Sequence, residues 1–122
     1  MKIETGNLNH QKDSEKRGWF IGHFMQEDSP FQSHNFEVRW AVHSKGEVKP
    51  TVAANKIAKT ISVLIKGKMI LKFPKDDEEI VLSKEGDYAF WDSNIYHTSE
   101  ILEDSTVLTI RWPSISGDQK SL

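Results

Sequence analysis

The stretch GDYAFWDSNIYH, from Gly86 to His97, holds a short strand between two turns. Its first residues, glycine and aspartate, are common in tight turns. The apolar and aromatic run Tyr88 to Trp91 follows and favours a β-strand. Asp92 and Asn94 then supply a second turn, since asparagine tolerates a left-handed backbone better than most residues. The apolar chain resumes over Tyr96 to Leu102, so the whole stretch predicts a hairpin.

Strand signals of the same kind recur about every ten residues outward from this hairpin. Residues 35–44 alternate apolar and polar side chains, which is typical of a strand with one buried face. Further strands are expected at 19–25, 58–66, 69–73, 80–82 and 106–112. Lys66-Gly67-Lys68 predicts a tight turn, and Val52 to Ala58 is the one helical candidate. Eight or nine short strands predict an all-β, antiparallel barrel or two-sheet fold.

Size and composition indicate one domain. The chain has 122 residues, and we expect residues 1–17 to be a polar leader and 113–122 a flexible tail. It has no cysteine, which excludes disulfides, thiol catalysis and cysteine-bound metals and suits a reducing compartment. No stretch has the roughly 18 apolar residues of a membrane helix, and the start lacks the apolar core of a signal peptide. We therefore expect a cytoplasmic protein without a membrane partner.

Charge is sorted along the chain. Residues 45–75 contain eight lysines and one acid, whereas residues 76–104 contain ten acids and one lysine. One interpretation of the basic run is a nucleic-acid surface. Such surfaces usually contain arginine and several aromatic residues, whereas this run has no arginine and one aromatic residue. We favour two segments that lie side by side and neutralise each other across strands, and we expect no nucleic-acid partner.

The stretch from Gly86 to His97 resembles the second conserved motif of the cupin superfamily. In that motif a glycine, five residues, a proline, one residue, a glycine and two residues precede a metal-binding histidine. Gly86 and His97 match, while Asp92 replaces the proline and Asn94 the glycine. The resemblance covers about residues 36–112. It implies an antiparallel double-stranded β-barrel, or jelly roll, with a ligand pocket inside.

The first cupin motif, which ends in a glutamate, six residues and a glycine, is degenerate here. Aligning Gly67 with the final glycine places Thr60 at the glutamate and Ala53 and Asn55 at the two histidines. Of the usual metal ligands the resemblance leaves only His97. Since a divalent ion needs three or four converging protein ligands, the standard metal site is dismantled.

A divalent metal held by a rebuilt ligand set is the open alternative. His43 is in phase with Arg39 on the more polar face of its strand. With His97 and a carboxylate such as Glu37 or Glu100, it would form a facial ligand set. Strand parity argues against Glu100, which is three residues from His97 and so faces the other side.

Six residues are candidates for binding a small molecule in the barrel. A histidine there supplies a ligand contact or a proton, or is a structural residue bonded to a backbone carbonyl. An arginine meets a carboxylate or phosphate, or pairs with an acid on the next strand. A tryptophan forms the pocket rim. The candidates are Arg39, His43, Asn55, Thr60, Trp91 and His97.

Three functions remain open for this pocket. The first is a binding or sensing module for a small organic molecule, with acids among the candidates. The second is a metal-dependent dioxygenase or isomerase with His43 and His97 as ligands. The third is metal-free acid–base catalysis by His97 and a tyrosine, Tyr88 or Tyr96. Independently, the strand Ile57 to Ile65 is apolar on both faces, so we expect a homodimer.

Overall fold

The computed structural model describes residues 3–11 and 15–122, and these residues form an antiparallel all-β fold. One 3₁₀ helix, η1 (Leu8–Gln11), precedes the strands. The eight strands are β1 (Trp19–Ile21), β2 (Glu37–His43), β3 (Ala53–Asn55), β4 (Lys59–Phe73), β5 (Glu78–Leu82), β6 (Tyr88–Trp91), β7 (Thr98–Trp112) and β8 (Gln119–Ser121). The predicted all-β double-stranded barrel is confirmed.

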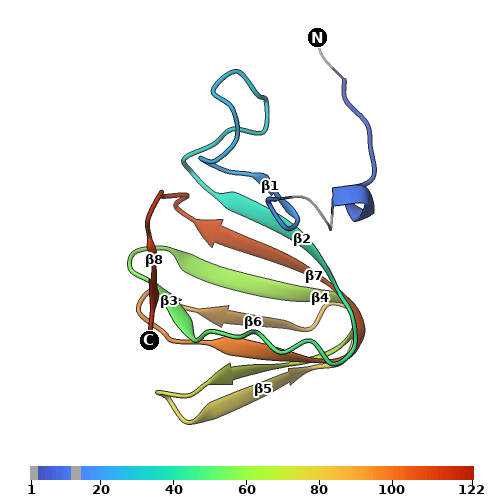
Figure 1. The fold of residues 1–122 in the computed structure, drawn as a ribbon, viewed down its shortest axis with the longest axis vertical. Coiled ribbons are helices and arrows are strands. Elements are labelled where there is room, and N and C mark those ends of the chain that lie inside the picture. The colour runs from blue at the N-terminus through green and yellow to red at the C-terminus, as the bar shows by residue number, and fades with distance from the viewer. Residues whose placement is uncertain (1–2, 12–14) are drawn as a thin grey trace.

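The long strands β4 and β7 pair antiparallel over most of their length and carry the rest of the fold (Figure 1). The predicted turn at Lys66-Gly67-Lys68 is wrong, because β4 continues through these residues without reversing its direction. The register between β4 and β7 shifts there. Gly67 has φ 100°, and a side chain there would collide with the carbonyl of Asp104 and with Ser105. Glycine therefore allows a bulge where β4 and β7 approach closely, and the strands bend instead of reversing.

The bend divides the sheet into two walls. In the first wall, the Lys59–Leu64 half of β4 lies between β6 and the second half of β7, which pairs with β2. In the second wall, the Met69–Phe73 half of β4 lies between β5 and the first half of β7. Segment 46–53 extends the second wall, since Lys49 N–H and Ala53 N–H donate to the carbonyls of Ser99 and His97.

The helix expected over Val52 to Ala58 is absent, and β3 and a bend stand there instead. β3 pairs with β8, so the C-terminal segment expected to be a flexible tail carries a strand (Figure 1). The side chain of Asp118 explains both differences. It accepts hydrogen bonds from the backbone N–H groups of Ile57 and Ala58, which fixes the turn after β3 and ties the last residues to it.

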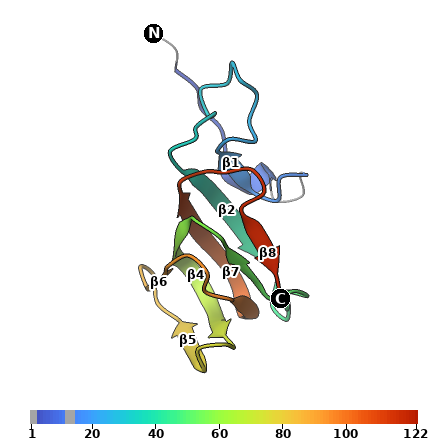
Figure 2. The same cartoon turned by 90° about the vertical axis from the view of Figure 1, so that its left-hand side faces the viewer.

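The N-terminal residues and the loop between β1 and β2 extend beyond one end of the barrel, and β5 lies at the other (Figure 2). The predicted polar leader contains η1, and Trp40 Nε1 on β2 donates to Asn9 Oδ1 at 2.7 Å. Residues 1–2 and 12–14 of that leader lie outside the described residues. No helix in the described part of the chain is long and apolar enough to span a membrane.

The basic and acidic runs do lie side by side. Lys72 faces Glu79 across β4 and β5, and Lys68 faces Glu103 across β4 and β7. Lys72 Nζ is also 3.3 Å from a carboxylate oxygen of Glu100. The predicted side-by-side arrangement is confirmed, with a cross-strand ion pair between Lys72 and Glu100.

Candidate functional site

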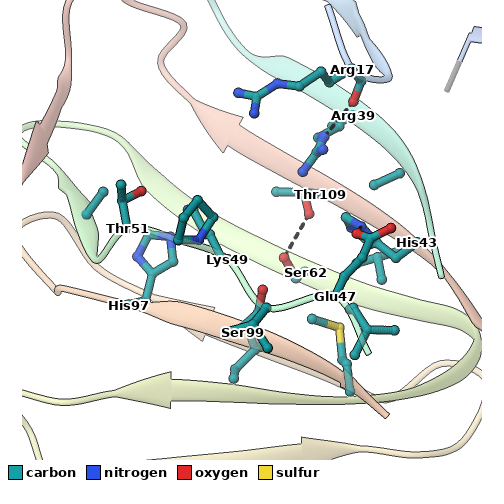
Figure 3. A pocket seen from close by; sticks show the side chains of 18 of the residues that line it. Arg17, Arg39, His43, Glu47, Lys49, Thr51, Ser62, His97, Ser99 and Thr109 are labelled. Atoms are coloured by element: carbon teal, nitrogen blue, oxygen red, sulfur yellow. Dashed lines mark hydrogen bonds and ion pairs between the residues drawn. The ribbon is translucent and has the colours of Figure 1, made fainter. Parts of the chain in front are cut away.

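A pocket of about 600 Å³ lies between the two walls. The first wall gives it residues of β2, β4 and β7, and the second wall gives it segment 47–53 and the first part of β7 (Figure 3). Its apolar lining is formed mainly by Ala41, Met69, Leu71, Trp91, Ile101 and Val107. Its polar lining includes Ser62 and Thr109, whose hydroxyl oxygens are 2.8 Å apart.

Four cationic side chains line this pocket, and they come from four segments. Arg39 lies on β2 and Arg111 lies on β7. In the register of the two strands, Arg39 pairs with Thr109, which is two residues before Arg111. Arg17 lies in the turn before β1, and Lys49 lies on the segment that crosses to β3. Alternation along β2 and β7 turns Arg39 and Arg111 to the barrel interior, beside Ala41 and Thr109.

Only one of the four cations has a carboxylate within ion-pair distance among the described residues. Arg111 Nη1 donates to Glu37 Oε2 at 3.4 Å, so this arginine pairs with an acid on the neighbouring strand. Arg39 Nε instead donates to the backbone carbonyl of Arg17 at 2.8 Å. Within the described residues, Arg17, Arg39 and Lys49 have no carboxylate at that distance.

Burial and the repulsion of neighbouring cations lower the pKa values of Lys49 and Arg39. Desolvation, then the charges of Arg111, Arg39 and Arg17, lowers the pKa of Lys49 from 10.5 to about 8. Desolvation and the neighbouring arginines likewise lower the pKa of Arg39 to about 10, although Glu47 opposes the shift. The pocket is thus a region of positive potential in which the cations repel one another.

His97 is buried at the pocket wall and is neutral at physiological pH. Desolvation and the charge of Lys49 lower its pKa to about 4. Its Nδ1 lies 3.3 Å from the carbonyl oxygen of Ile95, which assigns the proton to Nδ1 and leaves Nε2 as an acceptor. Its ring lies against Trp91, with ring centroids 4.7 Å apart. His97 therefore has both the backbone contact of a structural histidine and a place in the pocket lining.

His43 also lines the pocket, but on a different side from His97 (Figure 3). His43 Nδ1 is 2.8 Å from Glu47 Oε2, and Glu47 Oε1 accepts from the N–H of Ser44. Burial alone would raise the pKa of Glu47, but the bonds from Ser44 and His43 outweigh it and lower that pKa. His43 and Glu47 form a hydrogen-bonded pair at one end of the pocket.

The donor set does not fit a cupin metal centre. Ala53, which takes one usual histidine position, lines the pocket but has no donor atom. In the described part of the chain, no three histidine, aspartate or glutamate side chains converge. Of the carboxylates considered from sequence, Glu37 is paired with Arg111 and Glu100 with Lys72.

The structure brings together four of the six predicted ligand-binding residues, since Arg39, His43, Trp91 and His97 line the pocket. Asn55 and Thr60 are buried but are not among its lining residues. Asn55 Nδ2 donates to Asp118 instead. Neither tyrosine lines the pocket either: Tyr88 is 64% exposed, and the Tyr96 ring faces Lys75 and Lys120.

Sequence reasoning missed Lys49 and Arg17 as pocket residues. Lys49 is one of eight lysines in the basic run, and no periodicity separates it from the others. Its distinguishing signal is the following Pro50, which keeps Lys49 extended and outside a helix. Arg17 precedes a glycine with positive φ at the entry to β1, so its position depends on a turn rather than on a repeating pattern.

No protein-family model matches the chain, and no curated protein gives a significant match. Solved structures do match. A cupin protein from Bacteroides fragilis is 24% identical, with a TM-score of 0.57 over 67% of this chain and 69% of that one. A Klebsiella pneumoniae protein with a double-stranded β-helix domain is 10% identical, with a TM-score of 0.68 over 98% and 97% of the two chains.

An enzyme is also among the similar structures. The DMSP lyase DddQ from Ruegeria pomeroyi is 16% identical, with a TM-score of 0.65 over 84% of this chain. This chain spans 48% of the lyase's length. Identities this low establish the fold and leave the activity open. The chain has the double-stranded β-barrel fold of the cupin superfamily, as its resemblance to the second cupin motif predicted.

Proposed function

We propose that the protein binds, or senses, a small anionic organic molecule inside the barrel. The observation that carries this proposal is the set of three cations, Arg17, Arg39 and Lys49, that line the pocket without a carboxylate partner among the described residues. Arg39 and Lys49 are half-buried, while Arg17 is exposed. Charges withdrawn from water are ordinarily paired, because an uncompensated one is costly. A ligand anion supplies the missing partner, and its hydrogen bonds to arginine and lysine are charge-assisted.

The proposal assigns separate tasks to the pocket residues. Arg39 and Lys49 bind the anion, and His97 Nε2 accepts a hydrogen bond from a ligand hydroxyl or from Lys49. Trp91 and the aliphatic side chains around it cover the carbon skeleton. None of these contacts needs a metal.

Binding is tested by titration calorimetry with a panel of small carboxylates and phosphate esters. We expect at least one to bind, and we expect Arg39→Met and Lys49→Met each to weaken the tightest binder of the panel about tenfold or more. Lys84→Met is the matched control, because Lys84 is exposed in the turn before β6, away from the pocket. No binding by the unmodified protein to any anion of the panel would contradict the proposal.

The metal-dependent dioxygenase or isomerase is the alternative, and elemental analysis separates it from the proposal. Near-stoichiometric metal in protein purified without chelator, lost in His97→Ala, would overturn the metal-free pocket. The position of His43, turned to Glu47 across the pocket from His97, disfavours that result.

We also propose a homodimer that buries the outer face of the first wall. Alternation places Ile61 and Val63 of β4 on that face, beside their register partners Ile110 and Leu108 of β7. Phe90 of β6 continues the face and is 49% exposed. The face has an apolar centre, and a second copy is its self-complementary partner.

Sedimentation velocity at micromolar concentration tests the dimer. We expect a dimer for the unmodified protein and a monomer for Phe90→Asp, which places a charge in the centre of the interface. A monomer for the unmodified protein contradicts the proposal. The anion site is independent of this result, since its residues face the barrel interior.

We further propose that the protein acts in the cytoplasm. The absence of cysteine supports this, because small secreted domains are often stabilised by disulfides, whereas disulfides are rare in the reducing cytoplasm. Fractionation of the native source, with the protein found in the periplasmic or secreted fraction, would contradict it.

A further inference from the structure

The three pocket cations that have no carboxylate partner in the described part of the chain fall into two groups. Arg17 and Arg39 lie together at the first wall, joined by the hydrogen bond from Arg39 Nε to the Arg17 carbonyl (Figure 3). Lys49 belongs to the segment that extends the second wall, where its charge acts on His97. An anion bound by the arginines and one bound by Lys49 therefore occupy different parts of the pocket.

The charges that line the pocket do not cancel. Glu37 is taken by Arg111, which removes that arginine from the balance. Glu47 is the one carboxylate among the described lining residues, and its oxygens are engaged by His43 and by the Ser44 N–H. Three cations against one carboxylate leave an excess of two positive charges.

The pocket lining that adjoins Arg39 at its register positions on β7 and β4 carries no charge. Arg39, Thr109 and Ser62 are register partners on β2, β7 and β4, so the hydroxyl pair lies directly beside Arg39. These two hydroxyls are hydrogen-bonded to each other, and the aliphatic side chains of Leu71 and Ile101 lie in the same lining. Such a surface suits a short carbon chain between two charged ends.

We propose that the ligand is a short organic dianion with one anionic group at each end, one bound by Arg17 and Arg39 and the other by Lys49. This inference rests on the proposed function and narrows its ligand class. Two separated charges neutralise the excess where it occurs, whereas a monoanion leaves either Lys49 or the arginine pair uncompensated.

Titration calorimetry on the full chain at about pH 7 and constant ionic strength tests the inference. The probes are the α,ω-dicarboxylates from malonate to adipate, the monocarboxylates of the same chain lengths, and glycerol 3-phosphate. We expect at least one dicarboxylate to bind about tenfold more tightly than its matched monocarboxylate. Lys49→Met should remove this advantage and change monocarboxylate affinity by less than about twofold, while Lys84→Met should change neither.

The outcomes separate the two proposals. Equal affinity for matched mono- and dicarboxylates overturns the two-ended ligand and leaves anion binding in place. Binding of glycerol 3-phosphate without any dicarboxylate also overturns it, because both charges then sit on one group. Failure of every probe to bind overturns the proposed function itself. Circular dichroism of Lys49→Met checks that the variant is folded.

Discussion

Two charged regions of this barrel, one buried and one half-buried, are built in opposite ways. At Asp118, which is 7% exposed, the chain itself supplies the partners: Asn55 Nδ2 and the N–H groups of Ile57 and Ala58 all donate to the carboxylate at 2.9–3.1 Å. At Lys49 and Arg39 no acid of the described residues comes within ion-pair distance, and neighbouring cations make the region more positive.

The difference shows that one charged group stabilises the fold, whereas the other charged groups lack a carboxylate partner among the described residues. Asp118 stabilises the junction of β3 and β8, because its loss leaves backbone donors without acceptors. Lys49 and Arg39 cost stability in the free protein, since each is desolvated and repelled. Variants of the two regions should therefore change stability in opposite directions.

The largest expected effect is at Asp118. Asp118→Ala should destabilise the protein by about 3–4 kcal/mol, because it removes three hydrogen bonds to a buried carboxylate and leaves buried N–H groups unpaired. Urea denaturation measures this. Asp92→Ala is the control and should have little effect, as Asp92 is exposed and, within residues 3–11 and 15–122, accepts only from its neighbour Ser93. Equal losses in both variants would remove the contrast.

The next effect is the pH dependence caused by His97. Its folded pKa of about 4 lies below the usual 6.5, so the folded state binds fewer protons than the unfolded state in this window. Stability should therefore fall as pH drops from about 6.5 to about 4, by up to about 3 kcal/mol from this group. His97→Asn should make the pH profile flatter than that of the unmodified protein. Identical slopes would show that His97 is not buried as a neutral group.

A smaller effect of opposite sign is expected at Lys49. Lys49→Met should raise the free energy of unfolding by about 1 kcal/mol, because it removes a repelled, desolvated charge. The folded pKa of about 8 is below the usual 10.5, so stability of the unmodified protein should rise as pH increases through that range. The variant should lose this rise. A destabilised Lys49→Met would mean that Lys49 already has a partner in the free protein.

The smallest effect belongs to the surface pair of Lys72 and Glu100, whose side chains are 36% and 35% exposed. Lys72→Met should change stability by less than about 1 kcal/mol, because solvent screens exposed ion pairs. Added salt should reduce even that difference. A loss as large as that of Asp118→Ala would show that burial is not what distinguishes these regions.

The strands of the first wall could be predicted from sequence because they have one buried face. The alternation over residues 35–44 places Arg39 and His43 on the interior side, and both line the pocket. Gly67 was misread because a glycine between lysines is a turn signal, whereas the close approach of β7 that requires it is a tertiary contact.

The position of Asn55 shows the limit of motif alignment. The motif alignment placed Asn55 at a ligand position, and Asn55 does lie on a strand, β3. Its side-chain amide nevertheless donates to Asp118, which is 63 residues away in the sequence. Lys49 shows the converse: it lies on an irregular segment held by β7, and no local pattern predicts where such a segment will lie. Both outcomes depend on contacts between distant residues.

The corner at Gly67 has a consequence for how this pocket can diversify. Because β4 and β7 each run through both walls, the angle between the walls is set at that corner, where no residue needs to touch a ligand. A change in the bulge would widen or narrow the pocket by changing the angle between the walls. The residues that line the pocket would stay the same. The size of ligand that fits then depends on the corner at Gly67, whereas the charge of the ligand depends on the lining residues. Substitutions can therefore change one property without changing the other.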